Sequence, residues 1–408
     1  MTGPIDIPQI ASDIDRLGLH SWLLIELTSS FREARKHKLK TFNEHSYDER
    51  WNENIEHLTN AILENYYQPS SSISFIIFDP MIREIFAAPF VDRVVHHFLY
   101  RMQYGWWDRR FITDSYSCRE EKGTLYGIQR AQRMMQQVTN NFTEPARIIK
   151  LDISGYFMSL PRRKLFKRIK WGLQRQFGPY LDLPSARELY KICLFLWHQV
   201  IFDDPVRKSR RRGSISDWDV LPPEKSLYTR DYGYGIVIGN LTSQLVSNIY
   251  LDQLDRFIKY ELGYKYYGRY VDDFFIMVPE SQYEKAKKDV RRIEKFLKDK
   301  LELRLHIKKR YYSSVYQGMS FIGARVYPHC LYPSNRLQKK FDQTIYRFKR
   351  GRGKEESMIS YFGFLVHLDA KEYVKKTFER HKLDYNIYLE SLSDNRRSWH
   401  ELLDDLRK

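Results

Sequence analysis

Three aspartates stand at or inside short apolar and aromatic runs of this chain. Asp152 ends the run RIIKLD, and Asp272 and Asp273 interrupt the run KYYGRYVDDFFIMVPE. This pattern predicts one strand that ends in a carboxylate and a β-hairpin with two carboxylates at its tip. Aspartate is also common in hairpin turns for conformational reasons alone. Here no glycine follows the pair and both flanks are strongly apolar, which favours a chemical role.

Three carboxylates from two such segments could bind divalent metal ions. Mg²⁺ takes oxygen ligands and is commonly held by one or two carboxylates together with substrate phosphates. Two neighbouring ions can activate a hydroxyl group for attack on a phosphate and stabilise the leaving group. We expect Asp152 and Asp272 to bridge two Mg²⁺ ions, with Mn²⁺ as a substitute, and Asp273 to be the more peripheral ligand.

The segments that must position these aspartates alternate between strand and helix patterns. Strands are expected at 74–78 and 83–86, on either side of Asp79-Pro80, and again at 147–152 and 270–278. Helices are expected at 22–67, 92–103, 126–137, 162–177, 186–200, 243–262 and 284–300. In the last helix Ala286, Val290, Ile293 and Leu297 form an apolar face, with Phe296 at its margin. This order predicts an α+β fold rather than a single doubly wound sheet.

The charge and the aromatic content favour a nucleic-acid partner. The 408 residues carry a formal net charge of +17 and a pI near 9.5, which attracts polyanions, although a basic surface is often only a solvated lysine face. The chain also has 30 Tyr and 24 Phe, and aromatic rings among arginines and lysines can stack on unpaired bases. An aromatic-rich core is the other interpretation of this composition.

The cysteines and the N-terminus indicate the compartment in which the protein is expected. Cys118, Cys193 and Cys330 are far apart and show no paired spacing, which argues against a disulfide framework and a zinc cluster. The N-terminus lacks a basic region followed by an apolar stretch, and no apolar run is long enough to span a bilayer. We therefore expect a soluble, cytoplasmic protein without a membrane partner.

The two aspartate motifs resemble those of bacterial reverse transcriptases. Tyr270-Val271-Asp272-Asp273 is similar to their YxDD signature, and Asp152-Ile153-Ser154-Gly155-Tyr156-Phe157 resembles their first catalytic motif, in which an aromatic pair follows the aspartate. The resemblance extends from about residue 75 to residue 326 and includes PFVDRVVHH, SYSCREEKG and FIGARV. It implies an RNA-directed DNA polymerase that makes cDNA from an RNA template by two-metal-ion nucleotidyl transfer.

The segment IGNLTSQ at 238–244 indicates a subfamily. It resembles the IGNxxSQ form of diversity-generating retroelement enzymes, whereas group II intron and retron enzymes usually carry a QGxxxSP-like sequence. A Gly-Asn turn before Thr-Ser also fits an ordinary helix cap, and both interpretations can hold. The alternatives are a reverse transcriptase of a bacterial antiviral defence system and a catalytically inactive RNA-binding module.

The resemblance also implies a nucleotide-binding set of Arg83, Phe157, Gln244, Tyr270 and Lys309. Phe157 falls where these enzymes place the aromatic ring that collides with a ribonucleotide 2′-hydroxyl, and the other interpretation is an ordinary core residue. Gln244 would face the templating base pair and the incoming nucleotide.

The residues expected to contact the triphosphate match the family pattern only in part. Arg83 matches an arginine that grips the triphosphate, but the lysine often found two positions earlier is Met81 here, which leaves Arg93 or Lys122 as further contributors. The lysine near pyrophosphate is Lys308 or Lys309, and the sequence does not decide between them.

The resemblance divides the chain like a right-hand polymerase. It gives an N-terminal helical extension at 1–70, fingers and palm at 71–330 with an insertion loop at 205–235, and a helical thumb at 331–408; the antiparallel palm sheet would carry the carboxylates. In the thumb, the four residues expected to follow the template-primer backbone, or to form a solvated helix face, are Arg347, Lys349, Arg350 and Arg352. The implied partners are template RNA, cDNA or primer, and dNTPs, with a small accessory protein as a further candidate.

Overall fold

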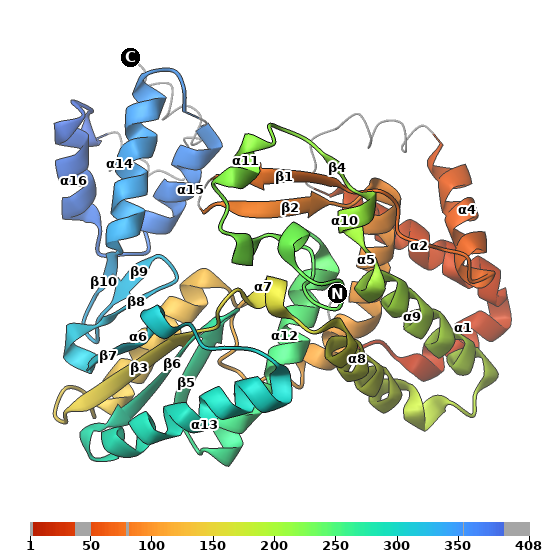
Figure 1. Ribbon diagram of the computed structural model, residues 1–408, viewed down its shortest axis with the longest axis horizontal. Coiled ribbons are helices and arrows are strands. Elements are labelled where there is room, and N and C mark those ends of the chain that lie inside the picture. Colours follow the sequence, from red (N-terminus) through yellow and green to blue (C-terminus); the bar gives the residue numbers. More distant parts are fainter. Residues whose placement is uncertain (1–2, 37–49, 79–80, 354, 387–408) are drawn as a thin grey trace. The chain divides into compact units, whose positions relative to one another are not determined.

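The computed structural model of the protein describes residues 3–36, 50–78, 81–353 and 355–386 (Figure 1). Over these residues the fold is α+β, as the sequence predicts. The chain forms two compact units: unit 1 comprises Met1–Glu120, Asp152–Gly263 and Val290–Lys308, and unit 2 comprises Glu121–Leu151, Tyr264–Asp289 and Lys309–Lys408. The expected turn at Asp79-Pro80 and the end of the expected thumb lie outside the described residues.

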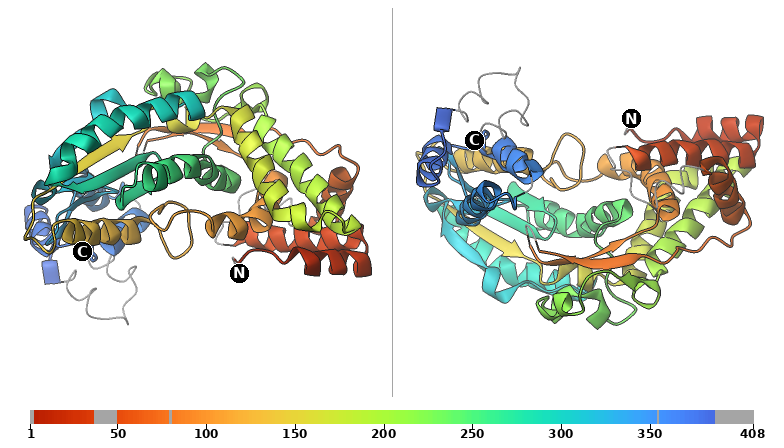
Figure 2. Two further views of the ribbon diagram at one scale, coloured as in Figure 1. Left: turned by 90° about the horizontal axis from the view of Figure 1, so that it is seen from below. Right: turned by 90° about the horizontal axis from the view of Figure 1, so that it is seen from above.

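Unit 1 is mainly helical, because its segments bury apolar side chains at helical spacing. In α2, for example, Leu23, Leu27 and Phe31 are all buried. The pairs α2–α5, α8–α9 and α5–α12 pack together, and α8 and α9 lie side by side in both views of Figure 2. The helices are α1 (Ile7–Leu17), α2 (Leu19–Arg35), α4 (Trp51–Leu63), α5 (Phe90–Asp108), α7 (Tyr156–Ser159), α8 (Arg162–Phe177), α9 (Pro184–Phe202) and α12 (Leu241–Arg256), which continues as a π-helical turn over Phe257–Glu261.

Unit 1 also holds a three-stranded sheet in the order β2-β1-β4. β1 (Ile73–Ile77) and β2 (Arg83–Ala87) pair antiparallel, which confirms the two predicted strands. β4 (Arg210–Arg211) pairs parallel with β1.

The segment 205–235, expected as a loop, contains β4 and several short helical turns. These are α10 (Pro205–Lys208), α11 (Ser216–Asp219) and the 3-10 turns at Pro223–Lys225 and Leu227–Thr229. The segment is ordered against the sheet because Leu227 packs with Phe86 and Met158 in a small hydrophobic core. The polar composition of the segment does not reveal these few buried residues, which include Leu221 and Leu227.

Unit 2 contains a four-stranded sheet, β5-β6-β3-β7, and a three-stranded sheet, β10-β9-β8. The strands are β3 (Ala146–Asp152), β5 (Tyr266–Tyr270), β6 (Asp273–Pro279), β7 (Tyr311–Ser314), β8 (Met319–Phe321), β9 (Ala324–Val326) and β10 (Leu331–Pro333). α6 (Thr124–Val138) packs on β5 and β6, with Ile128, Ala131 and Met135 among its buried residues. β6 is buried at five consecutive positions, as expected of an interior strand covered on both faces.

The remaining helices match the sequence patterns closely. In α13 (Tyr283–Leu301) the predicted face of Ala286, Val290, Ile293 and Leu297 is buried, and the half-buried Phe296 stacks on Phe257 with 4.2 Å between ring centroids. The C-terminal helices are α14 (Asn335–Lys349), α15 (Glu355–Leu365) and α16 (Lys371–Arg380). None of the helices in the described residues has both the length and the hydrophobicity that a bilayer span requires.

Candidate active site

The β5–β6 hairpin carries two of the three predicted aspartates at its tip, as the sequence predicts. Tyr270 pairs with Asp273, which leaves Val271 and Asp272 as a two-residue turn. Val271 has φ of 55°, a conformation that favours glycine and is an outlier for a β-branched residue. Such strain persists only where the surroundings enforce it, and it concentrates at functional sites.

A buried arginine enforces this turn. Arg269 of β5 is 0% exposed, and its Nη1 donates a hydrogen bond of 3.0 Å to the carbonyl oxygen of Val271. A buried guanidinium needs acceptors, so this contact satisfies part of its charge and ties the turn to the strand. Sequence reasoning missed Arg269, although a lone charge inside an aromatic strand was the available signal.

The neighbouring strand β3 brings a cation to the hairpin. The Lys150 Nζ lies 2.5 Å from Asp273 Oδ1, and the two side chains are only 19% and 25% exposed. Near the other end of these strands, Glu280 N donates to Pro145 O at 3.0 Å, so β3 and β6 run antiparallel. Lys150 was also missed by sequence reasoning, although it is the single cation in an otherwise apolar strand end.

Asp152 ends β3, as predicted, and the chain beyond it is held by backbone contacts within unit 1. The Asp152 carbonyl accepts a hydrogen bond of 2.8 Å from His306 N, and Ser154 N donates to Arg304 O at 2.8 Å. Gly155, at φ of 53°, then turns the chain into α7. A Cβ at Gly155 would lie 3.2 Å from the Glu224 carbonyl, so the position suits glycine on two counts.

Unit 1 groups the segments that carry Phe157, Arg83 and Gln244. The Phe157 carbonyl accepts from Ile236 N at 3.0 Å, and Phe86 of β2 donates from its N to the carbonyl of Ile238 at 3.3 Å. The segment that precedes α12 therefore contacts both the α7 turn and the β2 strand. The side chain of Phe157 is half-buried, whereas those of Arg83 and Gln244 are exposed.

The helix begins where the cap interpretation places it, but the Asn240 side chain makes no capping hydrogen bond. Asn240 is the N-cap residue of α12, and its carbonyl accepts from Ser243 N at 3.1 Å. Gly239 precedes it at φ of 125°, and a Cβ there would lie 3.3 Å from Ile85 of β2. The glycine therefore allows the helix start to approach the strand.

The other predicted site residues of unit 2 lie at two locations, beside the start of α6 and at the end of α14. The Tyr270 hydroxyl lies 3.5 Å from Thr124 Oγ1 at the start of α6. The four predicted thumb residues Arg347, Lys349, Arg350 and Arg352 are all exposed at the end of α14. Their recorded partners also belong to the C-terminal helices: Lys349 Nζ donates to the His381 carbonyl, and the Arg350 guanidinium lies 4.3 Å from the Tyr346 ring centroid.

The remaining lysine candidates lie at the end of a short 3-10 turn, Ile307–Lys309. Lys308 and Lys309 are both exposed. The structure therefore does not select one of them as the residue near pyrophosphate. The two further triphosphate candidates are less exposed than this pair: Arg93 Nε donates to the Ala88 carbonyl at 3.0 Å, and Lys122 Nζ lies 5.8 Å from the Tyr126 ring centroid.

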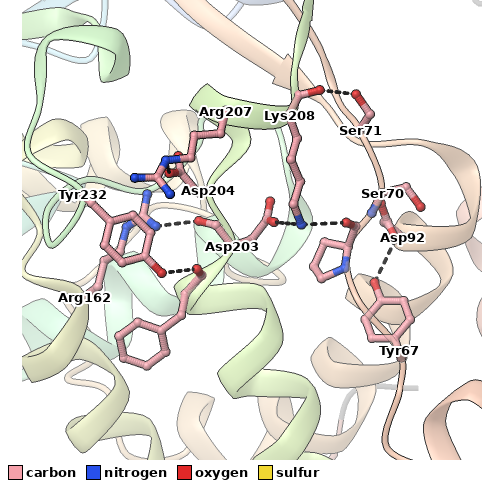
Figure 3. A network of polar contacts seen from close by, with 12 residues as sticks. Tyr67, Ser70, Ser71, Asp92, Arg162, Asp203, Asp204, Arg207, Lys208 and Tyr232 are labelled. Atoms are coloured by element: carbon pink, nitrogen blue, oxygen red, sulfur yellow. Dashed lines mark hydrogen bonds and ion pairs between the residues drawn. The ribbon is translucent and has the colours of Figure 1, made fainter.

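A cavity in unit 1 that also holds charged side chains, missed by sequence reasoning, lies against the segment that leads into α12. It has a volume of about 40 Å³, and its lining includes Asp92, His96, Arg162 and Asp203. Arg162, only 3% exposed, donates to the Gly235 carbonyl at 2.8 Å. It also donates to the Asp203 carbonyl (Figure 3). A buried arginine thus fixes one end of the segment that carries the IGNLTSQ sequence.

Burial changes the ionisation of two groups in this cavity. Asp92 accepts hydrogen bonds of 2.8 Å from the Tyr67 hydroxyl and from Ser70 N (Figure 3), yet burial raises its pKa to about 6. Burial lowers the pKa of His96 to about 3, so its ring is neutral near pH 7, and its Nδ1 lies 2.9 Å from Thr242 Oγ1. Neutral His96 therefore contacts the first turn of α12, whereas Asp92 bonds to Tyr67 and Ser70 on the other side of the cavity lining.

The donor chemistry of the aspartates fits a hard divalent cation. Within the described parts of the chain, no group of three or more His, Cys, Asp or Glu side chains is arranged to hold a metal ion. The cation recorded beside the hairpin is instead the ammonium of Lys150. Carboxylate oxygens are the ligands that Mg²⁺ prefers, and the contact with Lys150 shows that Asp273 attracts a positive charge.

No protein-family model matches the chain, and no curated protein matches its sequence. The assignment of a function therefore depends on the residues themselves and on their contacts.

Proposed function

We propose that the chain is a reverse transcriptase, an RNA-directed DNA polymerase of the diversity-generating retroelement type that acts in the cytoplasm. The observation that carries the proposal is the strained β5–β6 hairpin. Its turn is tied to the buried Arg269, and its Asp273 contacts Lys150 of β3. In this proposal the sheet β5-β6-β3-β7 is the palm of a right-hand polymerase.

Asp152, Asp272 and Asp273 would hold the two Mg²⁺ ions of such an enzyme. When bound, these ions supply charge stabilisation to the attacking hydroxyl and to the leaving pyrophosphate. Lys150 would orient Asp273 before nucleotide arrives. Arg269 would hold Asp272 in place through the Val271 carbonyl, because a turn fixed in advance needs no reorganisation when substrate binds.

The remaining residues would bind substrate. Arg83 and either Lys309 or its neighbour Lys308 would contact the triphosphate. Phe157 would stand against the sugar, and Gln244 and Tyr270 would border the nascent base pair. The cluster at the end of α14 would hold the template-primer backbone, which positions a duplex without reading its sequence.

The test is primer extension by the purified full chain on an RNA template, with dNTPs and either Mg²⁺ or Mn²⁺. We expect extension that depends on the metal and on the template. Extension on a DNA template alone, or extension only with ribonucleotides, would contradict the assignment to this class of polymerase. Sequencing of RNA and cDNA that copurify with the protein would separate a retroelement enzyme, whose template matches a nearby repeat, from a defence enzyme.

The second candidate function is an RNA-binding module without polymerase activity. The specific observation in its favour is that the cation recorded at Asp273 is a lysine of the same sheet. A protein of this kind would bind RNA but extend no primer with any divalent metal. The clustered acids at the hairpin tip weigh against it, because negative charge there would weaken binding to phosphates.

A further inference from the structure

Three consecutive arginines lie at the edge of the sheet in unit 1, two of them in the edge strand β4 and the third directly after it. Arg210, Arg211 and Arg212 are all exposed, and they come directly after a segment whose basic residues are neutralised. Arg207 and Lys208 each lie 3.1 Å from an aspartate, Asp204 and Asp203. By contrast, no carboxylate of the described residues lies within ion-pair distance of the three arginines. Their charge is therefore available to an external anion.

The strand is fixed in register against β1. Arg210 N donates to Ser72 O at 2.9 Å, and Arg212 N donates to Ser74 O at 2.8 Å. Because side chains alternate along a strand, Arg210 and Arg212 project to one face of the sheet and Arg211 to the other. The contacts agree, since the Arg212 guanidinium lies 4.6 Å from the Phe75 ring centroid.

On the opposite face of the sheet, the arginine contacts aromatic rings of the same chain. Arg211 lies 4.0 Å from the Tyr228 ring centroid and 5.1 Å from that of Trp218. The Tyr228 hydroxyl is itself 2.8 Å from Ser74 Oγ, so this face of the sheet is covered by the 205–235 segment. Arg211 thus stabilises the fold by packing on aromatic rings.

The face of Arg210 and Arg212 is partly open and apolar. Ile73, Phe75 and Ile77 alternate along β1 as half-buried residues on this face. A half-buried aromatic ring beside two exposed arginines provides the two interactions that hold unpaired nucleic acid, which are stacking on bases and contact with phosphates.

We infer that the sheet face of Phe75, Arg210 and Arg212, here called the β4 platform, binds an unpaired segment of RNA. Phe75 stacks with a base, while the two guanidinium groups contact successive phosphates on either side of it. The inference rests on the proposed function in one respect, since it takes the RNA to be the template before it is copied. An acidic protein and a base-paired duplex are the competing occupants.

The test measures binding without catalysis. All variants carry Asp272→Asn and are titrated with a short fluorescent unstructured RNA in EDTA, without dNTPs, over a series of salt concentrations. In the double variant Arg210→Gln/Arg212→Gln we expect weaker binding and a salt slope that is smaller by roughly 1.4, because each single-strand phosphate contact contributes about 0.7. Arg211→Gln is the matched control, and it should lower the melting temperature while it leaves the slope unchanged.

Substitution of the ring separates stacking from charge. Phe75→Leu should weaken binding on the order of tenfold without a change in salt slope, whereas Phe75→Tyr should bind like the parent. Circular dichroism establishes that each variant is folded.

The outcomes separate this inference from the proposed function. An unchanged slope in the double variant overturns the β4 platform even if the wild-type chain extends primers. If the wild-type chain never extends a primer but the double variant binds RNA more weakly than its parent, the proposed polymerase activity is wrong and the inference about the β4 platform stands. If the double variant loses affinity for polyglutamate or for an RNA/DNA duplex while it binds unpaired RNA normally, the platform belongs to that competitor and the inference is wrong.

Discussion

Phe157 is the residue on which sugar selectivity should depend. Its side chain is half-buried in the turn that follows Asp152, and its backbone is held by Ile236. If the ring excludes a 2′-hydroxyl, Phe157→Ala should raise ribonucleotide use relative to deoxynucleotide use, on the order of ten- to a hundredfold. Single-nucleotide insertion with matched dNTP and rNTP measures this ratio.

Phe157→Tyr provides the control for that experiment because it keeps the ring. It should retain the selectivity of the wild-type chain. A folded Phe157→Ala protein with unchanged selectivity would mean that the ring is only part of the hydrophobic core.

Asp92 should make the stability of unit 1 depend on pH. Its pKa is raised from 3.8 to about 6 by burial, so the folded state binds the proton more tightly than the unfolded state does. The stabilisation is therefore fully present below about pH 4 and is lost as the pH rises through about 6. The size of this effect is up to about 3 kcal/mol.

Urea unfolding of wild type and Asp92→Asn between pH 4 and 7 tests this sign. The free energy of unfolding of the variant, relative to wild type, should increase as the pH rises through this range. Asp182→Asn, at an exposed position, should give a profile parallel to that of wild type. A profile of Asp92→Asn that is also parallel would contradict the raised pKa.

At the residue scale, the sequence predicts the aspartates but not the groups that hold them. Asp152 and the Asp272-Asp273 pair stand out because carboxylates are rare beside apolar strands. Lys150 and Arg269 carry the same signal, a charge in an apolar or aromatic strand, but their partners are set by strand register and by side-chain reach. Neither property can be read from one segment alone.

At the element scale, the hairpin should depend on Arg269. Arg269→Met removes a buried donor to the Val271 carbonyl and should lower the free energy of unfolding by about 1–3 kcal/mol. The same change should reduce kcat for extension more than the affinity for template-primer, because it loosens Asp272 and leaves the duplex contacts in place. Arg163→Met, at an exposed position in α8, is the control and should change neither quantity.

If Arg269→Met loses stability but extends primers at the wild-type rate, the arginine is a structural residue only. Chemical denaturation combined with steady-state extension kinetics distinguishes the two roles.

Elements with strong periodicity are those that the sequence predicts well. The buried face of α13 and the strands β1 and β2 follow from apolar spacing alone. The segment 205–235 does not, because its order comes from Leu227 packing on Phe86 and Met158, residues that are distant in the chain. The composition of the segment alone cannot predict a contact between residues that are distant in the chain.

At the scale of the whole molecule, the net charge of +17 favours nucleic acid, and particular clusters should account for most of the binding. Replacing Arg347, Lys349, Arg350 and Arg352 by Gln should weaken binding of an RNA/DNA duplex and flatten its salt dependence, since fewer counterions are released. Single-turnover extension at saturating template should change much less. Titration of a labelled duplex at several salt concentrations measures both effects.

A second quadruple variant separates local contact from net charge. Lys285, Lys287, Lys288 and Lys295 are exposed on α13, and their replacement by Gln removes the same charge. If both quadruple variants lower the salt slope equally, the cluster at the end of α14 is an ordinary solvated surface.

The organisation into two units is the feature that the sequence least reveals. Each unit is assembled from three stretches of chain, and the boundaries cross both β3 and α13. Patterns read along a sequence favour domains made of one continuous stretch. The boundaries at 70 and 330 follow from the family resemblance alone and remain predictions. The interleaving arises from long-range sheet pairing, such as that between β3 and β7.

The central claim is that the hairpin aspartates bind catalytic metal, and Asp272→Asn tests it most directly. The amide keeps the shape of the side chain but removes the charge that holds Mg²⁺. Primer extension on an RNA template should fall by several orders of magnitude, while the melting temperature and the affinity for template-primer in EDTA stay near those of wild type and of the exposed control Asp182→Asn. Extension by a folded Asp272→Asn protein at a rate near that of wild type would contradict the claim.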